Sequence, residues 1–130
     1  MSAQTLLSGG DKYYSYSGVV FGDVSVPATI QLILIPNTGL RDSLIQVQPY
    51  FGRPISNAAN SSVGVEIKLN DVVIYKQTGF DASTHHEQPT RIENTIPLFI
   101  PRQSKLEVIS LNTTENNTQE RGANLMGYYL

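Results

Sequence analysis

The sequence predicts an all-β fold, namely an antiparallel β-sandwich of the jelly-roll type with about eight strands. First, apolar and polar residues alternate with period two, and no stretch shows helical periodicity over three turns. Second, Gly, Pro, Asn and Asp separate the apolar runs at regular intervals. Third, several connections are long, which favours a jelly roll over a simple meander. The length of 130 residues is that of one ordinary domain.

The first expected strand covers residues 12–21, "KYYSYSGVVF". It follows "SGGD", a stretch typical of a flexible joint. We therefore expect residues 1–11 to form an N-terminal arm and residues 12–130 to form a single β-sandwich domain.

The second expected strand covers residues 28–35 and is apolar on both faces. Alternation along a strand predicts that Leu32 and Leu34 face the core and that Ile33 and Ile35 face the opposite side. A sandwich covers only one face of each sheet, so Ile33 and Ile35 need a further cover. We expect a neighbouring subunit or the arm to supply it.

The third expected strand covers residues 44–51, and the next two form a hairpin around Asn70-Asp71. Asn and Asp tolerate the left-handed backbone conformation that a two-residue hairpin turn requires. Such a turn sets two cross-strand pairs whose apolar side chains share one face: Leu69 with Val72, and Ile67 with Ile74.

The remaining strands are expected at residues 91–100, 105–111 and 123–130. Pro97 has no N–H to donate to a sheet, so it predicts an edge, a bend or a bulge in its strand. Pro101 opens the turn "PRQSK", which sends the next strand back against the core.

Composition and motifs disfavour several functions. Only 15% of residues are charged and the net charge is −2, so we expect no nucleic-acid partner. The longest apolar run is "LILI" and the N-terminus has no signal-peptide pattern, so we expect no membrane partner. The chain has no Cys, and His85-His86-Glu87 lacks a distant third ligand. No catalytic motif is present, so we expect neither an enzyme nor a cofactor or metal.

The tyrosines near the two ends of the chain are the best candidates for binding. Tyrosine is enriched at protein interfaces because its ring is apolar and its hydroxyl is polar. Half-burial on the sheet and a glycan platform are the alternatives, and the absence of Trp weakens the glycan alternative. The candidate subunit or arm contacts are Tyr13, Tyr14, Tyr16, Ile33, Ile35, Tyr128 and Tyr129.

A short Cys-free chain, the stretch "IPLFIPRQSKLEVISLN" and the last strand "ANLMGYYL" together resemble small jelly-roll virion proteins of tailed phages. Capsid decoration (cement) proteins and head-fibre or spike knobs of that group have a similar layout. The resemblance covers about residues 24–130 and rests on architecture, so no binding residue is transferred from it.

This resemblance implies a virion structural protein that decorates and stabilises the phage head as an oligomer. A homotrimer is favoured, the partner is the major capsid protein, and the location is the head surface after synthesis in the host cytoplasm. The alternative is a receptor- or carbohydrate-binding tip of a virion fibre or spike. A cupin-like enzyme would need more metal ligands than the sequence gathers.

Overall fold

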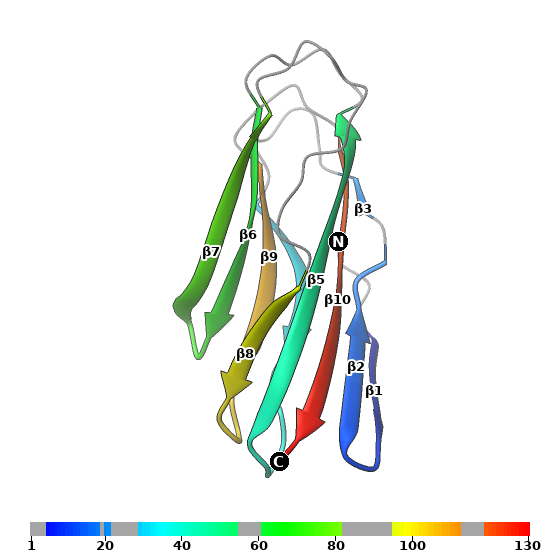
Figure 1. Cartoon of the computed structure of the whole chain (residues 1–130), viewed down its shortest axis with the longest axis vertical. Helices are drawn as coiled ribbons and strands as arrows, with labels where there is room; N and C mark the ends of the chain where they lie inside the picture. The colour runs from blue at the N-terminus through cyan, green and yellow to red at the C-terminus, as the bar shows by residue number, and fades with distance from the viewer. Residues whose placement is uncertain (1–4, 19, 22–28, 55–60, 82–94, 113–118) are drawn as a thin grey trace.

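In the computed structural model of the chain, the described residues form ten β-strands in two antiparallel sheets. The structure describes residues 5–18, 20–21, 29–54, 61–81, 95–112 and 119–130 (Figure 1). The strands are β1 (Thr5–Gly9), β2 (Lys12–Tyr16), β3 (Val20–Phe21), β4 (Ile30–Ile35), β5 (Ser43–Pro54), β6 (Ser61–Leu69), β7 (Val72–Asp81), β8 (Ile96–Ile100), β9 (Leu106–Asn112) and β10 (Gln119–Tyr129).

The strand order is that of a jelly roll and confirms the predicted fold class. One sheet has the order β1-β2-β10-β5-β8, and the other has the order β4-β9-β6-β7. Strand β3 continues the line of β2, because both pair with β10. From β4 onward the chain crosses repeatedly between the sheets, which produces the jelly-roll connection. If β2 and β3 are counted as one strand, β2 to β10 make up the eight strands of the jelly roll. Strand β1 is an additional strand that forms a hairpin with β2.

The N-terminal region forms part of the first sheet where the structure describes it. Residues 5–9 of the expected arm pair with β2 through the turn at Gly10, whose φ of 61° suits glycine. The division into an arm at residues 1–11 and a domain at residues 12–130 stays a prediction.

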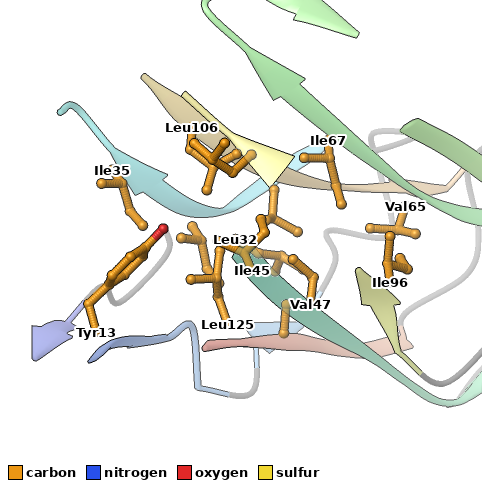
Figure 2. Close-up of a cluster of buried hydrophobic side chains, with 14 residues drawn as sticks. Tyr13, Leu32, Ile35, Ile45, Val47, Val65, Ile67, Ile96, Leu106 and Leu125 are labelled. Atoms are coloured by element: carbon orange, nitrogen blue, oxygen red, sulfur yellow. The ribbon is translucent and has the colours of Figure 1, made fainter. Parts of the chain in front are cut away.

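The hydrophobic core lies between the two sheets, as Figure 2 shows for its labelled side chains. Inward-facing residues alternate with outward-facing ones along β5, where Ile45 and Val47 are buried and Leu44 and Gln46 are exposed. The buried cluster consists of Tyr13, Leu32, Ile33, Ile35, Ile45, Val47, Val65, Ile67, Ile96, Ile100, Leu106, Val108, Ala123 and Leu125.

The expectation that Ile33 and Ile35 face away from the core is wrong. Both side chains are fully buried in the same cluster as Leu32. A β-bulge between Gln31 and Ile33 shifts the pairing with β9, and the extra residue reverses the alternation that follows it. The side of the strand that seemed to need an outside cover therefore faces the core.

The hairpin around Asn70-Asp71 is confirmed, but its register is only half as predicted. Both turn residues have positive φ, 51° and 69°, as the turn requires. Leu69 pairs with Val72 as expected, whereas Ile67 pairs with Tyr75 because a bulge follows. Ile74 is therefore displaced from the predicted pair.

Pro97 lies in β8, which pairs only with β5 among the described strands and so forms an edge. This confirms the edge reading of Pro97. The residues 101–105 connect β8 to β9, and Gln103 in this turn has a φ of 55°.

Candidate functional site

The outer face of the β2-β10-β5-β8 sheet carries rows of neutral side chains. Strand pairing places Tyr14, Met126 and Gln46 in one row across three strands. The next row contains Tyr16, Asn124 and Gln48 in the same order. Charged groups are therefore missing from these two rows, which is unusual for an exposed sheet face.

A hollow of about 210 Å³ lies over these two rows, and we call it the amide hollow. Its lining includes Tyr14, Tyr16, Gln46, Gln48 and Asn124. Tyr16 is 44% exposed, so much of its ring is accessible to a ligand. The hollow thus combines aromatic rings with side-chain amides that both donate and accept hydrogen bonds.

A second hollow of about 290 Å³ adjoins the first on the same face, and we call it the glycine hollow. Gln48 and Asn124 line both hollows. They are directly paired across β5 and β10, so they form the boundary between the two spaces. The glycine hollow is deepened by Gly18 and Gly122, which carry no side chain, and Tyr50 also lines it. The two hollows are therefore neighbours on this face, and we refer to them together as the groove.

A different surface gathers most of the exposed apolar side chains. The β1–β2, β4–β5, β6–β7 and β8–β9 connections and the last residue lie toward the same end of the sandwich, the lower end in Figure 1. We call this the turn end. Among the described residues, nine large hydrophobic side chains are exposed. Seven of these either lie in or within three residues of these connections or belong to the last residue: Leu40, Leu44, Val72, Val73, Ile74, Phe99 and Leu130.

Hydrogen bonds between the turns hold the turn end together. The β4–β5 connection bonds to the β8–β9 turn, with Thr38 N donating to Ser104 O at 2.9 Å and Gln103 N donating to Gly39 O at 2.7 Å. Asn70 N donates to Lys105 O at 2.9 Å, which ties the β6–β7 turn to the same cluster. The exposed apolar side chains are therefore presented by a connected backbone, which lowers the entropy that a partner must remove.

Two exposed ion pairs flank this cluster. Arg41 Nη1 lies 3.0 Å from Asp11 Oδ1, and Lys105 Nζ lies 2.7 Å from Asp71 Oδ1. The hydrogen bond from Lys105 lowers the pKa of Asp71, and the same bond raises the pKa of Lys105. Exposed pairs of this kind contribute little to stability, but each one links two different connections of the turn end.

The seven predicted contact residues are placed in three different environments. Tyr14 and Tyr16 meet at the amide hollow, and Tyr128 lies on the same outer face with Lys12 Nζ 5.4 Å from the centre of its ring. Ile33 and Ile35 are in the core. Their predicted contact role, like that of the tyrosines, stays a prediction.

Tyr13 and Tyr129 form the third environment, inside the turn end. Their ring centroids are 4.9 Å apart at an angle of 42°. The hydroxyl of Tyr13 and that of Ser43 share a hydrogen bond of 2.8 Å, and the hydroxyl of Tyr129 donates to Thr38 O at 3.0 Å. Burial, the largest effect, raises the pKa of Tyr13. These two tyrosines join strands to turns within one chain.

Sequence reasoning missed two features. The apolar turn-end residues are scattered along the sequence, and only single signs such as Leu40 after the turn residues "NTG" hint at them.

Arg121 is 1% exposed, and this burial lowers its pKa to about 10, so it still carries a positive charge at neutral pH. Its position within the strand-like run "QERGANLMGYY" gives no sign of this burial.

His85 and His86 lie outside the described residues. Within the described ranges, no group of three or more His, Cys, Asp or Glu residues is placed to hold a metal ion. The part of the chain that the structure describes contains no helix capable of spanning a bilayer.

Neither a protein-family model nor a curated protein sequence matches the chain. Among solved structures, the chain is similar to the infectious bursal disease virus VP2 subviral particle, with 13% identity and a TM-score of 0.42. The alignment covers 99% of this chain and 33% of that one, so the chain spans about one third of the length of the viral protein.

Proposed function

We propose that this chain is a virion structural protein that decorates a phage capsid and docks through its turn end. The observation that carries the proposal is the gathering of exposed apolar side chains there, including Leu40 at 78%, Val72 at 63% and Phe99 at 53% exposure. Apolar patches on an otherwise polar surface mark interaction sites, because covering them removes apolar area from water.

The hydrogen bonds within the turn end support the proposal that its exposed apolar side chains form a docking surface. The bonds from Asn70 to Lys105 and from Thr38 to Ser104 join separate turns into one unit. A preorganised surface loses little freedom on binding, so more of the gain from apolar burial appears as affinity. A decoration protein works by such burial and needs no chemical step.

The number of copies and the partner are part of the same proposal. The protein binds the major capsid protein on the head surface as a homo-oligomer, with a trimer favoured, and acts without catalysis. Stable interfaces bury roughly 1,200–2,000 Å² in total, and several copies bound together reach that area more easily than one. Residues 1–11 act as an arm that adds contacts to neighbours.

Cosedimentation tests this proposal. Purified protein is mixed with capsids that lack it, taken from the phage that encodes it, and the bound copies are counted at saturation. The proposal expects saturation at a fixed number of copies per capsid subunit. Absence of the protein from the capsid pellet at micromolar concentration would overturn it. The mass of the free protein in solution, measured by light scattering, decides between monomer and trimer.

A further inference from the structure

We propose that the groove formed by the amide hollow and the glycine hollow binds a neutral oligosaccharide. This site is separate from the turn end and adds a second activity to the proposed structural role. The groove lies along the outer face of β2, β10 and β5, and its two parts share Gln48 and Asn124.

The lining selects against charged ligands. None of the described residues that line either hollow is charged, so an anionic ligand would lose its hydration without gaining an ion pair from them. Lys12 belongs to the neighbouring row, where it pairs with Tyr128, and its Nζ lies 5.4 Å from the centre of that ring. The groove therefore suits a ligand that is polar and uncharged.

The amides provide the hydrogen-bonding groups that sugar hydroxyls need. Gln46, Gln48 and Asn124 are exposed and stand side by side on β5 and β10. No hydrogen bond from these amides to another described residue is found. Each amide offers two donors and one acceptor oxygen, and a sugar hydroxyl both donates and accepts. A row of amides thus matches a row of hydroxyls.

Each of the two hollows has an exposed aromatic ring in its lining. Tyr16 lines the amide hollow and is 44% exposed, and Tyr50 lines the glycine hollow and is 45% exposed. The negative face of an aromatic ring attracts the weakly positive C–H groups on the flat side of a sugar ring. Two exposed tyrosines, one in each hollow, therefore favour a ligand with at least two sugar units.

The size of the groove agrees with this ligand. The hollows measure about 210 and 290 Å³, and each is at or below the lower end of the roughly 300–1,000 Å³ that drug-sized ligands occupy. Each hollow therefore accommodates a single ring rather than a folded peptide segment. A protein partner would favour large apolar anchors, and those side chains gather at the turn end.

The test is a saturation-transfer NMR titration with the full-length protein. The probes are neutral di- and trisaccharides of glucose, galactose and N-acetylglucosamine, with sialyllactose as the charged comparison. We expect transfer to at least one neutral sugar and none to sialyllactose. Transfer to no neutral sugar, or stronger transfer to sialyllactose, would overturn the proposal.

Three variants locate the site. Loss of one aromatic contact is worth roughly tenfold in affinity, so Tyr16→Ala should weaken binding by about that factor. Gln48→Ala should weaken it as well, because Gln48 lines both hollows. Phe99→Ala is the matched control, since it removes an exposed aromatic ring from the same sheet but outside both hollows. Equal binding by Tyr16→Ala and wild type would place the sugar elsewhere and contradict the proposal.

Capsid binding by the same variants separates this proposal from the structural one. Tyr16→Ala should bind capsids like the wild type, because Tyr16 is not part of the turn end. If Tyr16→Ala instead abolishes capsid binding, the groove is a protein interface and the saccharide proposal is wrong. Unchanged melting temperatures of all three variants show that the fold is retained.

Discussion

The ring of Tyr13 occupies the space above Gly127 on the neighbouring strand. The two residues are direct partners across β2 and β10, and a Cβ atom added at Gly127 would overlap the Tyr13 ring. The backbone of Gly127 is not in the left-handed region, so its conformation does not demand glycine. Packing against the Tyr13 ring is what requires a residue without a side chain at this position. Because Gly127 has no side chain, the buried ring of Tyr13 fits against it and places its hydroxyl 2.8 Å from that of Ser43.

Replacing Gly127 with alanine should destabilise the protein by about 1–3 kcal/mol, the range for overpacking a core. Urea unfolding measures this change. The control is the same substitution in a Tyr13→Leu background, where the ring is gone and the added methyl group costs less. An equal cost in both backgrounds would show that the Tyr13 ring is not what Gly127 accommodates.

Tyr13→Phe should also destabilise the protein, by about 1–3 kcal/mol, because it leaves the fully buried hydroxyl of Ser43 without its 2.8 Å partner. The double variant Tyr13→Phe with Ser43→Ala removes both hydroxyls and should recover part of the loss. The same urea unfolding measurement applies. A double variant that is less stable by the sum of both single losses would contradict a direct bond.

The stability of the folded protein should fall at alkaline pH because of Tyr13. Burial raises the pKa of Tyr13 above its ordinary value of 10.0, so the unfolded chain loses this proton first. The stabilisation that comes from the protonated Tyr13 hydroxyl is fully present below pH 10. It is lost as the pH rises from 10 toward the raised pKa of Tyr13 in the folded protein. Unfolding free energies measured between pH 8 and pH 11 should therefore decline more steeply for the wild type than for Tyr13→Phe. Parallel declines would contradict the raised pKa.

The turn between β6 and β7 should reject β-branched residues at Asp71. Its φ of 69° is unfavourable for such residues, at roughly 1–2 kcal/mol for the left-handed conformation. Asp71→Val should be less stable than Asp71→Gly by about that amount. Both variants remove the ion pair with Lys105, so their difference in melting temperature isolates the backbone effect. Equal melting temperatures would contradict the turn conformation.

The sequence was sufficient to predict the fold class, because alternation and turn residues are local signals. Asn70-Asp71 illustrates this, since the turn needs only two residues that tolerate positive φ. Register beyond the turns was less predictable. The bulges near Ile33 and Ile67 add one residue to a pairing, and no residue type at these points announces them. After each bulge, the side chains that alternation predicts for one face of the sheet lie on the other face.

The two candidate surfaces could be predicted only in part. Residue type alone points to Tyr14 and Tyr16 as binding candidates, and the structure places both at one hollow. The amides that complete the groove come from β5 and β10, which are far apart in sequence and adjacent only through the jelly-roll topology. Likewise, Leu40 and Phe99 reach the same end because several turns converge there. Such convergence depends on long-range pairing, which local patterns do not encode.

Capsid cosedimentation of a matched pair of variants tests the central claim most directly. Leu40→Ser combined with Phe99→Ser removes two of the most exposed apolar side chains of the turn end without touching the core. Tyr16→Ala serves as the matched control on the other surface. Docking through the turn end predicts at least a tenfold loss of capsid affinity for the double variant and wild-type affinity for the control. Wild-type affinity of the double variant would contradict the account.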